Sequence, residues 1–99
     1  MAGYVIAIIE VTNPEGYKPY AQQVPAVIAK YGGRYLARGG RTEFREGQWP
    51  GTRTVIVEFP SLERALEWFD SPEYAPLKRL RQANSTGRFA FIEGLAESR

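Results

Sequence analysis

The chain has 99 residues, which fits a single domain with one core and leaves little room for a separate catalytic lobe. Hydrophobic residues make up 43% of it and charged residues 24%, as in an ordinary soluble globular domain. The net charge of +2 is too small to predict nucleic-acid binding, and the run Lys78-Arg79-Leu80-Arg81 spreads its cations around a helix surface.

Neither cysteine nor histidine occurs in the sequence. Their absence excludes disulfides, zinc–thiolate sites and histidine-ligated metals or haem, and it removes the commonest general base. A metal ion would need clustered carboxylates, which the sequence does not show, so we predict no metal. Catalysis would use Asp, Glu, Tyr, Lys, Arg, backbone groups or a bound cofactor, and no cofactor is predicted.

The first predicted strand covers residues 3–11 and is apolar on both faces. One face carries Val5, Ala7 and Ile9, and the other carries Tyr4, Ile6 and Ile8. Such a strand belongs in the middle of a sheet that is covered on both sides. The apolar run is too short to span a membrane and lacks the basic region of a signal peptide. We therefore expect a cytoplasmic protein that makes no membrane contact.

A helix is predicted from Asn13-Pro14 to Tyr31. Asn13 can cap the free amide groups, and Pro14 at the first helical position loses no hydrogen bond. Apolar residues follow at helical spacing, namely Tyr17, Tyr20, Val24, Val27, Ile28 and Tyr31. Pro25 is expected to kink the helix, and Gly32-Gly33 to end it.

Two strands joined by a long connection are expected next. The first covers residues 34–38, with a bulge or bend at Gly39-Gly40 and a candidate continuation over residues 42–45. The turn covers residues 47–51. The second strand, residues 52–59, alternates Val55, Val57 and Phe59 with Thr54, Ile56 and Glu58.

The last third of the chain predicts two helical segments and a strand. Pro60 ends the preceding strand, and Ser61 caps a helix with Leu62, Ala65, Leu66 and Phe69 on its apolar face. Ser71-Pro72 restarts a helix that ends near Asn84. Residues 88–94 are the last predicted strand.

The order β-α-β-β-α-β predicts an α+β protein with a ferredoxin-like fold. We expect one domain over residues 1–99, with its core at about 3–95 and a frayed tail at 96–99. In this fold a four-stranded antiparallel sheet carries the helices on one face. Because the first strand is apolar on both faces, the open face of the sheet needs a partner. The simplest partner is a second copy of the chain, so we expect a homodimer.

Several motifs, in this order, resemble the family catalogued as domain of unknown function 1330. They are Tyr31-Gly-Gly-Arg-Tyr-Leu-Ala-Arg-Gly-Gly40, Val57-Glu-Phe-Pro-Ser61, Ser71-Pro-Glu-Tyr74, Arg81 and Glu93-Gly94. The resemblance covers Tyr4 to Leu95 and implies a dimeric α+β barrel, in which two ferredoxin-like sheets pack face to face. Related barrel families include cofactor-independent monooxygenases, lactone isomerases and haem-degrading enzymes, but a shared fold does not carry a function.

Two carboxylates, Glu58 and Glu93, interrupt strands that are otherwise largely apolar. A carboxylate near a core needs a partner, and Arg38 and Arg81 are the expected ones. Such pairs have a structural interpretation, in which they join strands or subunits or lie at strand ends that reach water.

They also have a functional interpretation, in which an arginine binds an anionic group while a carboxylate or tyrosine moves a proton. In that case the catalytic candidates are Tyr74, Glu58 and Glu93, and the substrate-binding candidates are Arg38, Arg81, Tyr17 and Tyr20. Trp68 is assigned to the core or an interface, and Trp49 to a turn that folds onto the dimer.

Three functions are left open by the sequence. The first is a small dimeric enzyme, an isomerase or monooxygenase that converts a carbonyl or aromatic, anionic molecule without metal or haem. The second is a non-catalytic ligand-binding module, and the third is a structural interaction protein.

Overall fold

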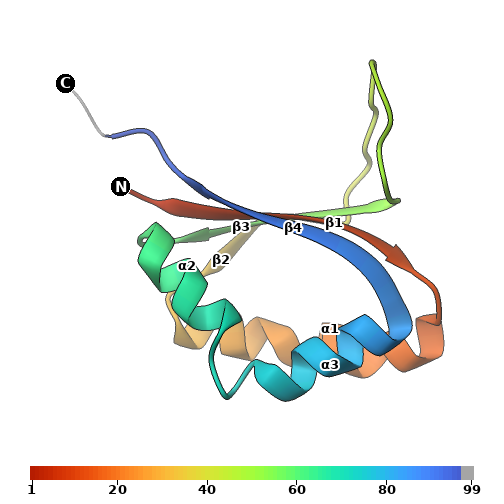
Figure 1. Ribbon diagram of the computed structural model, residues 1–99, viewed down its shortest axis with the longest axis horizontal. Coiled ribbons are helices and arrows are strands. Elements are labelled where there is room, and N and C mark those ends of the chain that lie inside the picture. The colour runs from red at the N-terminus through yellow and green to blue at the C-terminus, as the bar shows by residue number, and fades with distance from the viewer. Residues whose placement is uncertain (97–99) are drawn as a thin grey trace.

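The computed structural model describes residues 1–96 and confirms the predicted ferredoxin-like α+β architecture (Figure 1). Within this range the chain forms one antiparallel sheet of four strands, with three helices on one of its faces. The strands are β1 (Gly3–Val11), β2 (Arg34–Arg38), β3 (Arg53–Phe59) and β4 (Ser85–Glu93). Residues 97–99 of the predicted tail lie outside the described residues.

The sheet has the strand order β2-β3-β1-β4, so β1 occupies a central position as its apolar sequence predicts. On one side β1 pairs with β3, from Gly3↔Phe59 to Ile9↔Arg53. On the other side it pairs with β4 along its whole length, as far as Val11↔Ser85. The edge strand β2 pairs with β3, and its register shifts between Tyr35 and Ala37.

The helices are α1 (Pro14–Lys30), α2 (Leu62–Phe69) and α3 (Ala75–Asn84). Pro14 stands in the first turn of α1, where a missing amide hydrogen costs no hydrogen bond. The Ser61 hydroxyl caps α2 by accepting a hydrogen bond from the Arg64 amide at 3.0 Å. α1 continues through Pro25 to Lys30.

Three predicted boundaries are wrong, each for a local reason. α3 begins at Ala75 rather than Pro72, because the Ser71 hydroxyl accepts from the Tyr74 amide and closes a turn before the helix. β4 begins at Ser85, directly after α3, because its pairing with β1 extends to Val11. Residues 42–45 form no strand and belong to a long arm, residues 39–52, that joins β2 to β3.

The core lies between the helices and the sheet. Its strand residues are Val5, Ala7, Ile9, Val57 and Phe59, and its helix and turn residues are Tyr17, Tyr20, Val24, Ile28, Ala65, Trp68, Tyr74 and Leu77. The opposite face of the sheet carries no helix in the described part of the chain (Figure 1). None of the helices in residues 1–96 is long and apolar enough to cross a membrane.

Candidate functional site

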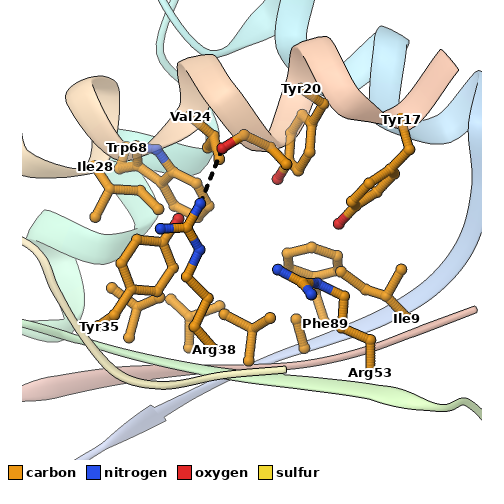
Figure 2. Close-up of a pocket in the computed structure, with 15 residues that line it drawn as sticks. Ile9, Tyr17, Tyr20, Val24, Ile28, Tyr35, Arg38, Arg53, Trp68 and Phe89 are labelled. Atoms are coloured by element: carbon orange, nitrogen blue, oxygen red, sulfur yellow. Dashed lines mark hydrogen bonds between the residues drawn. The ribbon is translucent and has the colours of Figure 1, made fainter. Parts of the chain in front are cut away.

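A cavity lies between α1 and the sheet, inside the core of the single chain (Figure 2). Its walls are largely aromatic and comprise Tyr17, Tyr20, Tyr35, Trp68 and Phe89. Aliphatic residues complete it, namely Val5, Ala7, Ile9, Val55 and Val57 from the sheet and Ala21, Val24 and Ile28 from α1. With the side chains as they stand, its volume is about 30 Å³, enough for roughly two water molecules.

Arg38 lies at the edge of this cavity because of a β-bulge in β2. Tyr35 and Arg38 are three residues apart, so a regular strand would direct them to opposite faces of the sheet. The register shift between Tyr35 and Ala37 reverses the alternation, and both side chains line the cavity. The Arg38 guanidinium stacks over the Tyr35 ring at 4.7 Å and donates to the Ala21 carbonyl of α1 at 3.0 Å (Figure 2).

Arg53 is the second guanidinium on the cavity wall, and it comes from the first residue of β3. Its Nε atom is buried and has no hydrogen-bond partner within residues 1–96. An unpaired buried donor costs about 1–3 kcal/mol, so this nitrogen is suited to an acceptor that enters the cavity. Figure 2 shows the Arg53 side chain beside Phe89, below Tyr17.

Three phenols of the cavity wall are held in the neutral form. Burial raises the pKa of Tyr17, and the neighbouring Arg53 opposes that rise without cancelling it. Burial also raises the pKa of Tyr35, against an opposing effect of Arg38. For Tyr20 burial raises the pKa strongly, and contact with Tyr74 raises it further. At neutral pH these groups are therefore hydrogen-bond donors and not bases.

Tyr20 is connected to a buried polar cluster behind the cavity. Its hydroxyl lies 2.8 Å from the Tyr74 hydroxyl, and Arg81 Nε donates to the same Tyr74 oxygen at 3.2 Å. Tyr74 is completely buried, and Arg81 is 4% exposed. The Arg81 guanidinium also stacks on the Phe89 ring at 4.2 Å. Tyr74 and Arg81 thus lie one layer behind the lining.

The two candidate carboxylates lie away from this cavity. Glu58 projects from the open face of the sheet, where it accepts from Arg34 Nε at 2.7 Å and from the Tyr4 hydroxyl at 3.3 Å. Its predicted pairing with Arg38 or Arg81 is wrong, because neighbouring residues of β3 alternate between faces. Glu93 is exposed at the end of β4, opposite Gly3.

The structure therefore brings together five of the seven predicted site residues and separates the other two. Tyr17, Tyr20 and Arg38 line the cavity, with Tyr74 and Arg81 behind them. Sequence reasoning missed Arg53. This residue occupies alternate positions of β3 with Val55 and Val57, so the three side chains share one face of the strand, and this alternation could have identified it. Sequence reasoning also missed Tyr35, which faces the cavity because it pairs with the buried Val57 across the sheet.

The comparison with known families agrees with this architecture. A family model described as domain of unknown function (DUF1330) matches residues 2–95. The chain belongs to this family. Its membership confirms the resemblance drawn from the sequence motifs, and it assigns no activity. Among curated proteins, none matches the sequence.

Several solved structures resemble the chain. The RPA0582 protein of unknown function from Rhodopseudomonas palustris has a TM-score of 0.77 and 18% identity, over 97% of this chain and 84% of that one. SnoaB, a cofactor-independent oxygenase from Streptomyces nogalater, has a TM-score of 0.65 and 15% identity, over 97% and 94%. Rv0793 from Mycobacterium tuberculosis has a TM-score of 0.58 and 20% identity, over the full length of both chains. At these identities the likeness shows a shared fold alone.

Proposed function

We propose that the protein binds a small organic anion with a planar aromatic or conjugated carbonyl body in the cavity beneath α1. The observation that carries the proposal is the charge of the lining. Arg38 and Arg53 contribute two cations, and no carboxylate is found among the described residues around the cavity. Two like charges that face one apolar space repel each other, and an anionic ligand would neutralise them.

The walls and the unpaired donor support the same ligand. Five aromatic rings surround the cavity and suit a flat conjugated body, as in many small-molecule sites. A carboxylate, phenolate or enolate oxygen would accept from the buried Nε of Arg53. A hydrogen bond to a charged group is worth about 1.5–3 kcal/mol.

An aromatic ligand is larger than the cavity of about 30 Å³, so the cavity must open to admit it. Arg38 lies where its movement would open the cavity. The side chain is exposed and is tied to α1 by its hydrogen bond to the Ala21 carbonyl. Breaking one such bond costs about 1 kcal/mol. Arg38 would then swing outward and return onto the anion, so the same residue would admit the ligand and hold it.

The described lining favours stabilising an anion over abstracting a proton. Its ionisable groups are phenols with raised pKa values and arginines, and none of these takes up a proton near neutral pH. Conversion would therefore act on a ligand that enters, or is held, in its deprotonated form. SnoaB, which shares the fold, is a cofactor-independent oxygenase. We therefore propose addition of dioxygen to the bound anion as the first reaction to test, with non-catalytic binding as the alternative. In this step a carbon of the anion supplies the electron pair, a C–O bond forms as the O=O double bond becomes single, and a solvent proton completes the hydroperoxide.

A chromophoric anion tests the binding proposal. The absorption of 4-nitrophenol distinguishes its neutral and ionised forms, so a titration in the presence of protein measures the pKa of the bound molecule. We expect the wild-type protein to bind 4-nitrophenolate at millimolar concentration and to lower the pKa of the bound phenol. Arg53→Met should weaken binding about 10-fold or more, because it removes a charge-assisted hydrogen bond.

Arg79→Met is the matched control for this titration. Arg79 is exposed on α3, so its loss changes the net charge equally without touching the cavity. Binding that is equal in Arg53→Met and Arg79→Met, or absent in the wild type, would contradict the proposal. Oxygen uptake with an electron-rich phenolate then separates an oxygenase from a binding module.

We also propose that two copies associate through the open face of the sheet. That face is apolar at its centre, where Ile6, Ile8 and Ile56 are half-buried, and Leu36 and Ile92 are 50% and 47% exposed. The arm of residues 39–52 and residues 94–96, which follow β4, both project on this side, away from the helices (Figure 1). Phe44 and Trp49 stack on the arm, with ring centroids 6.5 Å apart. A second sheet packed on this face would bury these groups.

A further inference from the structure

In the hydrogen bonds that join Arg81, Tyr74 and Tyr20 behind the cavity, the chemistry of the groups decides which atom donates and which accepts. An arginine side chain donates and cannot accept, so the Tyr74 oxygen is the acceptor of the bond from Arg81. The Tyr74 proton must then find an acceptor elsewhere. Within the described chain the Tyr20 oxygen, at 2.8 Å, is the acceptor in place for it.

The reverse direction is unfavourable. If Tyr20 donated to Tyr74, the Tyr74 proton would have no acceptor among the side chains described here, although Tyr74 is completely buried. Leaving a buried donor unpaired costs more than a typical hydrogen bond contributes. The chain of donation therefore runs from Arg81 to Tyr74 and from Tyr74 to Tyr20.

This direction leaves the Tyr20 proton for the cavity. Tyr20 lines the cavity, and its hydroxyl points into it (Figure 2). Successive hydrogen bonds polarise one another, so a hydroxyl that accepts from Tyr74 is a stronger donor than an isolated phenol. Arg81, at 4% exposure and stacked on Phe89, cannot turn away to water.

We infer that the Tyr20 hydroxyl is a dedicated hydrogen-bond donor to the ligand, held in its donating orientation by Tyr74 and Arg81. The inference rests on the proposed function and adds a requirement for the ligand: an acceptor oxygen must lie opposite Tyr20 as well as beside the arginines. Tyr20 contacts the ligand, whereas Tyr74 and Arg81 are positioning residues that act through it. The site thus selects phenolates, enolates and carboxylates over molecules that present a donor at the same point.

A double-mutant cycle on 4-nitrophenolate binding tests this arrangement. We expect Tyr20→Phe to weaken binding about 10-fold. The absorption band of the bound anion should shift toward its position in a solvent that donates no hydrogen bonds. Tyr74→Phe keeps the Tyr20 hydroxyl but not its orientation, so it should weaken binding about 3-fold. If Tyr74 acts only through Tyr20, then adding Tyr74→Phe to Tyr20→Phe should weaken binding no further.

Tyr4→Phe is the control, because it removes a tyrosine hydroxyl that bonds Glu58 on the opposite face of the sheet. It should leave both affinity and band position unchanged. A wild-type protein that binds no 4-nitrophenolate defeats the proposed function. A wild type that binds while Tyr20→Phe binds equally well defeats this inference alone. An equal loss from Tyr74→Phe in both backgrounds also defeats it, since Tyr74 would then not act through Tyr20.

Discussion

The buried phenols of the cavity make the stability of the fold depend on pH. Burial raises the pKa of Tyr20 above its ordinary value of 10.0. Above about pH 10 the unfolded chain loses this proton while the folded protein keeps it, so rising pH favours unfolding. The stability that Tyr20 contributes is therefore complete below pH 10 and lost above it.

We expect the free energy of unfolding to fall above pH 10, and Tyr20→Phe to make that fall shallower by about 1.4 kcal/mol per pH unit. Urea titrations between pH 7 and pH 11.5 measure both slopes. Val24→Ala is the control, because it also alters the cavity wall but removes no ionisable group. It should lower the free energy of unfolding by an amount that does not change with pH. Parallel curves for Tyr20→Phe and the wild type would contradict the prediction.

At the scale of single residues, the sequence predicted five side chains that gather at one cavity and two that lie elsewhere. Tyr74 and Arg81 were predicted as site residues, and they lie one layer behind the cavity lining because both project from the α3 side into the core. Glu58 could have been assigned to the open face from the β3 alternation, had the buried parity been known. The side on which helices cover a sheet is decided by the whole fold and not by a single strand.

The contact between β1 and α2 shows how tightly the elements fit. A Cβ atom added to Gly3 would lie 2.5 Å from the Ser61 carbonyl oxygen and from the Leu62 amide nitrogen and Cα. These are backbone atoms at the start of α2, so no side-chain rotation relieves the clash. A larger residue would have to move α2 away from the sheet.

Gly3→Ala should therefore lower the free energy of unfolding by about 2 kcal/mol, as overpacking of a core does. Gly40→Ala is the matched control, because a Cβ at Gly40 meets nothing within 4 Å. Its effect should stay within about 0.5 kcal/mol. Urea unfolding of the three proteins gives the comparison, and equal midpoints for the two variants would show that α2 yields without cost.

At the scale of elements, periodicity predicted each strand and helix that positions the site, including the central place of β1. It could not predict the β2 bulge, which depends on pairing with β3 across the arm and not on local sequence. That bulge directs Arg38 to the cavity. The bulge or bend expected at Gly39-Gly40 is a bend at the start of the arm, where Gly39 adopts a φ of 71°.

At the scale of the whole molecule, helices cover one face of the sheet, and the other face carries no helix within residues 1–96. The proposed association of two copies uses this open face. Ile6, Ile8 and Ile56 lie side by side there because β1 and β3 pair in register, with Ile6 opposite Ile56. Burying apolar surface stabilises a complex by about 25 cal/mol per Å². Covering this face with a second sheet would therefore favour association of two copies. A monomer would leave this surface in contact with water.

Ile56→Lys should separate the copies without unfolding the chain. A lysine at this position is tolerated at a water-exposed face, but in a paired interface it would be a buried charge without a partner. We expect light scattering to give twice the mass of one chain for the wild type at micromolar concentration. The dissociation constant of the variant's dimer should be about 100-fold larger than that of the wild type, with unchanged circular dichroism.

Gln82→Lys is the control, because it makes the same charge change at an exposed position on α3, and it should remain dimeric. A wild type that is monomeric, or an Ile56→Lys variant as dimeric as Gln82→Lys, would show that the open face does not join the copies.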